Sequence, residues 1–130
     1  MDQGPMVIEE IDAAARFLGE FEKRIPVMAA FWLKASEDDS WYLYVASDEF
    51  NDKKLDVGYR EVVRLAGEMR DPNFDQFRVK LISPDDPLAK AVLDLLRCFP
   101  GRIARPIHRR NLGGVSVNEV YIYPTLTPVS

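Results

Sequence analysis

Cysteine and histidine each occur only once in this chain of 130 residues, as Cys98 and His108. A single cysteine excludes a disulfide within the chain and a zinc site built on cysteines. A single histidine leaves little room for histidine-based catalysis, and the Gly-x-Ser-x-Gly motif of many serine hydrolases is absent. The sequence therefore favours a non-catalytic role, and it predicts no cofactor.

Basic residues are also in short supply, with 17 Lys and Arg against 21 Asp and Glu and a net charge of -4. This balance argues against a general nucleic-acid coat protein and against a polybasic membrane anchor. No apolar run approaches the roughly 20 residues of a membrane-spanning helix. Residues 1–5 lack the basic flank and apolar stretch of a signal peptide. We therefore expect a soluble, cytoplasmic protein without membrane contact.

The most apolar part of the sequence is a hairpin predicted from strands 27–34 and 41–47, which the polar loop 35–40 joins. The first strand is apolar on both faces until its last residue, which is typical of a covered, central strand. The second strand places Tyr42 and Tyr44 on one face. If no helix covers that face, these two tyrosines are candidate interface aromatics.

Helical periodicity predicts helices over residues 7–23, Leu55 to Arg70 and Pro87 to about Cys98. The last of these has the clearest start, because Asp86 precedes a proline at the first helical position. The apolar residues that recur at helical spacing in the second helix are Leu55, Tyr59, Val62, Val63, Ala66 and Met69. Between the last two helices, the alternation of Phe77, Val79 and Leu81 with Arg78 and Lys80 predicts a half-buried strand.

The last segment predicts a second hairpin, with strands from Arg102 to Arg109 and from Val115 to Tyr123 and a turn over residues 111–114. A proline at position 106 places the first of these strands at a sheet edge. The expected order is α-β-β-α-β-α-β-β. It predicts an α+β fold with three helices and a mixed sheet of about five strands, in two hairpins plus one single strand. We expect one domain over residues 1–124 and a tail over residues 125–130.

Positive charge is concentrated in the first strand of this second hairpin. The candidate partner-binding or anion-binding residues are Arg102, Arg105, His108, Arg109 and Arg110. Arginine's planar fork suits phosphate and carboxylate groups, and an acidic protein surface would serve equally well. A charged edge strand that merely protects the sheet against aggregation is the alternative without function.

Carboxylates after the second strand offer one catalytic alternative, a metal-dependent hydrolase that uses Asp48, Glu49 and Asp52 with a hard cation such as magnesium. A restriction-nuclease-like core would also need an acid two residues before the lysine of the neighbouring strand. The corresponding tripeptide, residues 78–80, begins with arginine instead. A helix-capping loop explains these carboxylates more simply, so the sequence predicts no metal ligands.

The sequence as a whole favours a small recognition or assembly domain that acts through protein-protein or subunit contacts. A homodimer or a protein partner is the expected form of assembly. Binding of nucleic acid or another anion through residues 102–110, and metal-dependent hydrolysis through residues 48–52, remain the two alternatives.

Overall fold

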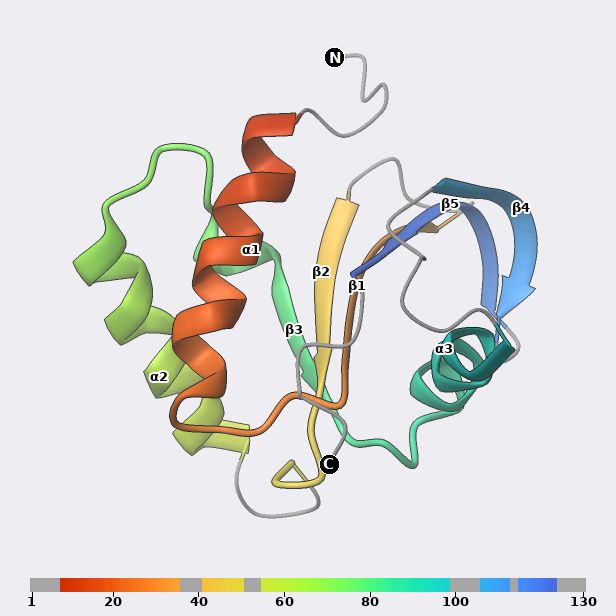
Figure 1. Cartoon of the computed structure of the whole chain (residues 1–130), viewed down its shortest axis with the longest axis horizontal. Coiled ribbons are helices and arrows are strands. Elements are labelled where there is room, and N and C mark those ends of the chain that lie inside the picture. The colour runs from red at the N-terminus through yellow and green to blue at the C-terminus, as the bar shows by residue number, and fades with distance from the viewer. Residues whose placement is uncertain (1–7, 36–40, 51–54, 99–105, 113–114, 124–130) are drawn as a thin grey trace.

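The computed structural model describes residues 8–35, 41–50, 55–98, 106–112 and 115–123 (Figure 1). Within these ranges the chain forms three α-helices, one short 3-10 helix and five strands. In chain order these elements are α1 (Ile8–Glu22), β1 (Ala29–Ala35), β2 (Trp41–Ala46), α2 (Leu55–Met69), η1 (Gln76–Arg78), β3 (Val79–Ile82), α3 (Pro87–Cys98), β4 (Pro106–Leu112) and β5 (Val115–Ile122).

The strands form one mixed sheet in the order β3-β2-β1-β5-β4. The central strand β1 pairs antiparallel with β2 and with β5. On one side β3 pairs parallel with β2, and on the other β4 pairs antiparallel with β5. The predicted α+β class, with three helices and a mixed sheet, is confirmed. The element order differs from the predicted one because η1 precedes β3.

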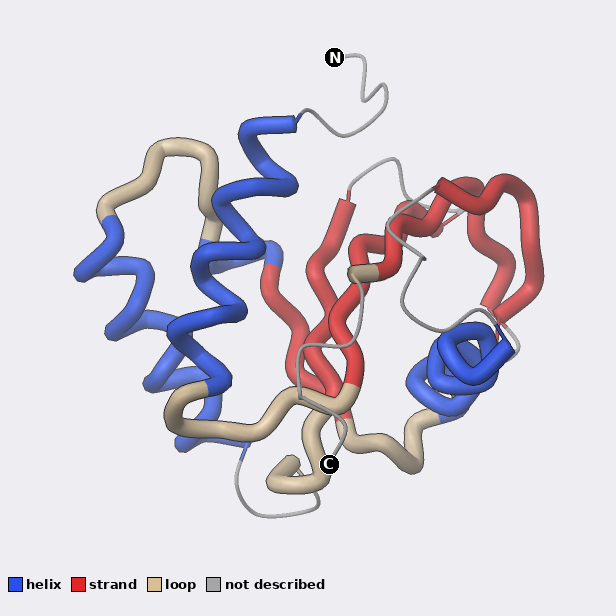
Figure 2. Tube along the Cα trace, in the orientation of Figure 1, coloured by secondary structure: helices blue, strands red, loops and turns tan. Residues whose placement is uncertain are grey.

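Helices cover both faces of the sheet: α1 and α2 lie on one side and α3 on the other (Figures 1 and 2). Successive side chains of a strand point to opposite faces, and β1 is buried on both. Ala30 and Trp32 belong to the core under α1 and α2. Phe31 and Leu33 belong to the core under α3. The apolar character of both faces of β1 thus predicted a covered strand correctly.

A buried chain of two hydrogen bonds connects α1 to the sheet. The indole Nε1 of Trp32 donates a hydrogen bond to the Tyr123 hydroxyl at 2.9 Å. That hydroxyl in turn donates to the carbonyl oxygen of Ile11 at 2.8 Å. Burial raises the pKa of Tyr123 far above its ordinary value, so the phenol stays protonated and able to donate.

We expect Tyr123→Phe to lower the free energy of unfolding by about 1 to 3 kcal/mol, because the indole N–H and the Ile11 carbonyl would both lose their partner. Urea denaturation measures this change. Tyr121→Phe is the matched control, since the ring of Tyr121 lies 5.4 Å from that of Tyr123 and is only half-buried. Equal losses in the two variants would contradict this role for the buried chain.

Glycine is required at one position of α2 by the packing of that helix on the sheet. A Cβ atom at Gly58 would lie 2.5 Å from Cε1 of Phe50 and 2.7 Å from Cδ1 of Leu81. Both neighbours are buried, so they have little freedom to move away. Gly67, in the last turn of the same helix, has no atom within 4 Å of such a Cβ.

The two glycines therefore predict opposite effects of one substitution. Gly58→Ala should lower the free energy of unfolding by about 1 kcal/mol or more, because overpacking exceeds the gain in helix propensity. Gly67→Ala should raise it by about 0.5 kcal/mol, because only the gain in propensity applies. Thermal denaturation of both variants tests the pair, and a stabilising Gly58→Ala would show that α2 does not pack as closely as described.

α3 begins and ends where the sequence predicted. The carboxylate of Asp86 accepts a hydrogen bond from the N–H of Leu88 at 2.9 Å, and Pro87 takes the first helical position. Leu88, Ala89 and Val92 then pack on the sheet. Across the ranges that the structure describes, no helix has the length and apolar character needed to cross a membrane.

Other boundaries differ from the predictions. Phe77 was expected in a half-buried strand but lies in η1, because the Asp75 side chain caps that 3-10 helix and delays the strand to Val79. The first hairpin begins at Ala29 rather than at residue 27. β4 lies at the sheet edge as Pro106 indicated, and it continues through residues 111 and 112 of the predicted turn. The predicted tail, residues 125–130, lies outside the described residues.

Candidate functional site

The edge of β3 is closed by its own neighbours. An open edge strand offers backbone N–H groups to other chains. Here the N–H of Val79 donates to the carbonyl oxygen of Gln76 in η1. The N–H of Leu81 donates to the hydroxyl of Tyr59 on α2 at 3.0 Å. These bonds occupy the outward N–H groups of β3 and so hinder strand addition, which favours side-chain contacts for a molecule that binds beside this edge.

α2 carries two neighbouring apolar stripes, and the core buries only one of them. The buried stripe consists of Gly58, Val62 and Leu65. The other stripe follows the helical spacing of positions 55, 59 and 63. Its side chains are 39% exposed at Leu55, 39% at Tyr59 and 57% at Val63. The apolar residues that predicted this helix by their spacing therefore belong to both stripes, and Leu55, Tyr59 and Val63 lie on the exposed one.

Phe77 extends this exposed stripe from α2 to η1. Its side chain is 82% exposed, the largest fraction among the large apolar residues that the structure describes. The carboxylate of Asp75 accepts a hydrogen bond from the Phe77 N–H at 2.9 Å and so holds the backbone of η1 in place. Below, the α2–η1 surface means Leu55, Tyr59, Val63 and Phe77.

A groove of about 420 Å³ separates the C-terminal half of α2 from η1. Its floor has space above Gly67, where an added Cβ would meet no atom. The groove is lined by Val63, Ala66, Gly67, Phe74, Asp75, Gln76 and Phe77. Asp75 is the one ionisable residue among these, and its carboxylate already caps η1. The groove is therefore suited to binding an apolar group.

Two ion pairs of mixed sign border the α2–η1 surface. On α2, Asp56 and Arg60 pair at 3.7 Å, and helical spacing places them beside Val63 on the outer flank of the helix. On η1, Asp75 and Arg78 pair at the same distance. Each flank thus offers one positive and one negative side chain. Such exposed pairs contribute little to stability, which leaves them able to exchange partners.

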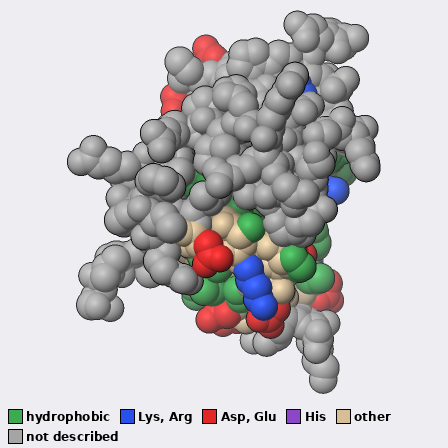
Figure 3. Space-filling view, turned by 90° about the vertical axis from the view of Figure 1, so that its right-hand side faces the viewer, with side chains coloured by type: hydrophobic (Ala, Val, Ile, Leu, Met, Phe, Trp, Pro, Cys, Tyr) green, Lys and Arg blue, Asp and Glu red, His purple; other side chains and the backbone are tan. Residues whose placement is uncertain are grey.

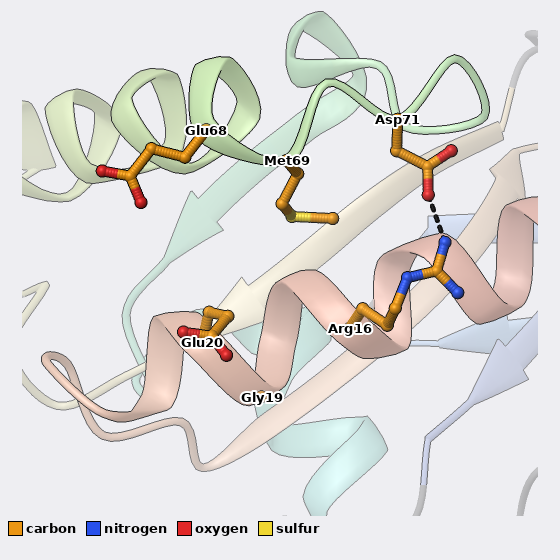
Figure 4. Close-up of a pocket in the computed structure, with 6 residues that line it drawn as sticks. All are labelled: Arg16, Gly19, Glu20, Glu68, Met69 and Asp71. Atoms are coloured by element: carbon orange, nitrogen blue, oxygen red, sulfur yellow. Dashed lines mark hydrogen bonds and ion pairs between the residues drawn. The ribbon is translucent and has the colours of Figure 1, made fainter.

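A second hollow, a cleft of about 570 Å³, lies between α1 and the end of α2 (Figure 4). It is lined by Arg16, Gly19, Glu20, Glu68, Met69 and Asp71. Figure 4 shows Arg16 reaching from α1 to Asp71 and Met69 pointing from α2 toward α1. Each charged lining residue has an ion-pair partner, since Glu20 binds Lys23, Glu68 binds Arg64, and Arg16 binds Asp71. The cleft therefore offers no unpaired charge to a ligand.

Asp71 serves to join the end of α2 to α1. Its carboxylate accepts a hydrogen bond from the N–H of Asn73 at 2.9 Å and binds the guanidinium of Arg16. The bond from Asn73 and, second, the contact with Arg16 hold the pKa of Asp71 below its usual value. Arg70, just before it, has a φ of 50° that turns the chain out of the helix.

This low pKa predicts a pH-dependent contribution to stability. Because the folded-state pKa lies below the unfolded value of about 4, the contribution is present above that pH and is lost as the pH falls below it. Between pH 7 and about pH 3, the melting temperature of the Asp71→Asn variant should therefore fall less than that of the unchanged protein. Melting curves at both pH values test this, and equal losses would mean that Asp71 ionises alike in the folded and unfolded chain.

The candidate basic hairpin is only partly described. Arg102 and Arg105 lie outside the described residues. The backbone of His108, Arg109 and Arg110 belongs to β4, where His108 pairs with Glu119 and Arg110 with Val117. The side chains of these residues are not described. Anion or partner binding through this strand therefore remains a prediction.

Tyr42 and Tyr44 lie on the face of the sheet that carries α3, and both are half-buried. The ring of Tyr44 stacks on that of Phe31, with centroids 5.3 Å apart. The ammonium of Lys80 lies 4.3 Å from the centroid of Tyr42. On the side of the molecule that carries α3, the described charged side chains are of both signs (Figure 3). Because α3 lies on this face, it is not the uncovered face on which the two tyrosines were expected, and an interface there stays a prediction.

The structure describes only two of the three candidate metal-binding carboxylates. Asp48 is exposed and Glu49 half-buried after β2, while Asp52 lies outside the described residues. The N–H of Glu49 donates to the hydroxyl oxygen of Ser47 at 3.2 Å, so part of this segment forms a local turn. No cluster of three or more His, Cys, Asp or Glu side chains suited to a metal occurs in the part of the chain that the structure describes.

Comparison with known proteins found no matching family model, no matching curated protein and no matching solved structure. Function is therefore inferred from the described surfaces alone. The α2–η1 surface was not predicted from the sequence. One feature of the sequence does indicate this surface: the apolar residues of α2 span a wider arc of the helix than one buried stripe requires.

Proposed function

We propose that this protein is a non-catalytic recognition domain that acts through protein-protein contacts, and that the α2–η1 surface is its contact site. The observation that carries this proposal is the position of Phe77. An aromatic ring that is 82% exposed stands at the rim of a groove and is held there by a capped 3-10 helix. Aromatic anchors of this kind dominate the binding energy of many protein interfaces.

The magnitudes support association as the role of this surface. Burying a phenylalanine or valine side chain completely is worth about 1.5 to 3 kcal/mol. In the isolated chain Phe77 and Val63 do not gain most of this burial free energy, because their side chains are 82% and 57% exposed. Interface cores are depleted of charge and enriched in aromatic residues, with charged residues at the rim. The α2–η1 surface has this composition.

The chemistry of the groove supports binding over catalysis. General acid–base catalysis needs a side chain positioned to exchange a proton with the substrate. The one ionisable lining residue, Asp75, is committed to the N–H of Phe77 and to Arg78. The remaining described lining residues are apolar apart from the amide of Gln76.

Photo-crosslinking in the cells that make the protein tests the proposal. A benzophenone amino acid in place of Phe77 should crosslink the full chain to a protein. Val63→Lys should lower the yield about tenfold or more, because it removes the burial of one aliphatic side chain. Val57→Lys is the matched control, since Val57 is 50% exposed on the same helix but outside the α2–η1 surface.

Two results would contradict this function. One is crosslinking to nucleic acid alone, which would favour the anion-binding alternative. The other is an equal yield from both lysine variants, which would mean that the reagent reports only chance encounters.

A further inference from the structure

We propose that the α2–η1 surface binds a second copy of this chain in a two-fold dimer. In this dimer Phe77 of each copy enters the groove beside Val63 and Gly67 of the other. The inference rests on the proposed function and narrows it to one partner.

The surface is complementary to itself. In a two-fold interface the same surface serves both copies, so each projection needs a matching hollow within the same patch. Phe77 is the projection, at 82% exposure. The groove of about 420 Å³ beside it is the hollow, and the open space above Gly67 lets a ring approach the helix backbone. A second copy would use both features at once, because each copy supplies one projection and one hollow.

The charges that border the α2–η1 surface are also complementary to the same charges on a second copy of the chain. A two-fold axis through the surface sets η1 of one copy against α2 of the other. The ion pair Asp56–Arg60 on α2 of one copy then lies near the ion pair Asp75–Arg78 on η1 of the other, and the two pairs can exchange partners across the interface. Because each flank carries one charge of each sign, the copies meet without like-charge repulsion. Flanks of a single sign would have repelled a second copy.

The mode of contact follows from the closed edge of β3. Two copies cannot easily pair through that strand, because its outward N–H groups at Val79 and Leu81 are bonded to η1 and α2. Side-chain packing of ring into groove is the remaining route beside this edge. Four apolar side chains make a small interface, so we expect a reversible dimer with a dissociation constant in the micromolar range.

Sedimentation of the purified full chain tests the proposal. The unchanged protein should pass from monomer to dimer as its concentration rises from about 1 μM to about 1 mM. Phe77→Ala removes the ring, and Gly67→Tyr fills the groove. Each variant alone should stay monomeric through this range, and Val57→Lys, whose change lies outside the surface, should dimerise like the unchanged chain.

A mixture of the two variants gives the sharpest result. A mixed dimer joins the groove of the Phe77→Ala chain, which keeps all its lining residues except the ring of Phe77, to the intact ring of the Gly67→Tyr chain. One of the two contacts is thereby restored without a clash. The mixture should associate about tenfold or more tightly than either variant alone. General stickiness would not produce this complementation. Gly67→Tyr should fold normally because its site is open, and its melting temperature verifies this.

The outcomes separate this inference from the proposed function. A monomer at about 1 mM would overturn the dimer, while crosslinking at position 77 to a different protein would keep the recognition role. A dimer that persists in both variants would overturn the inference by placing the interface elsewhere. Crosslinking to a second copy of the chain, lost in Val63→Lys, would support both.

Discussion

The closure of the β3 edge by α2 and η1 is the constraint on which the rest of the described surface depends. The Tyr59 hydroxyl reaches over the edge to the N–H of Leu81, and η1 supplies a carbonyl to Val79. To make this contact, α2 must lie close to the sheet. Gly58 allows this close approach because it places no side chain against Phe50. The helix is thereby rotated so that its second apolar stripe faces outward.

This arrangement links stability to the proposed recognition. The same rotation that buries Gly58, Val62 and Leu65 exposes Val63 and aligns it with Phe77 across a groove. Asp75 contributes to both roles, since it caps η1 and also forms one of the bordering ion pairs. By contrast, the cleft between α1 and α2 is bridged by Arg16 and Asp71 and has its charges satisfied internally. The first surface is open to a partner, whereas the second holds two helices together.

The sequence predicted those features that local chemistry decides. α3 was placed correctly because Asp86 and Pro87 form an unambiguous helix start. The central, covered position of β1 was predicted correctly because both its faces are apolar. The α2–η1 surface was missed for two physical reasons. Periodicity cannot tell which of two adjacent apolar stripes faces the sheet when a tertiary contact at Gly58 decides it. Alternation placed Phe77 in a strand, but the Asp75 cap favoured a 3-10 turn.

Two-dimensional NMR of the backbone amides during dilution tests the central claim most directly. Between about 1 mM and about 20 μM, the α2–η1 dimer predicts progressive shift changes confined to α2, residues 74–78 and the adjoining end of β3. The amides of α3 and of Tyr42 and Tyr44 should not move. Shifts that do not change with concentration, or that change on the α3 face instead, would contradict self-recognition through the α2–η1 surface.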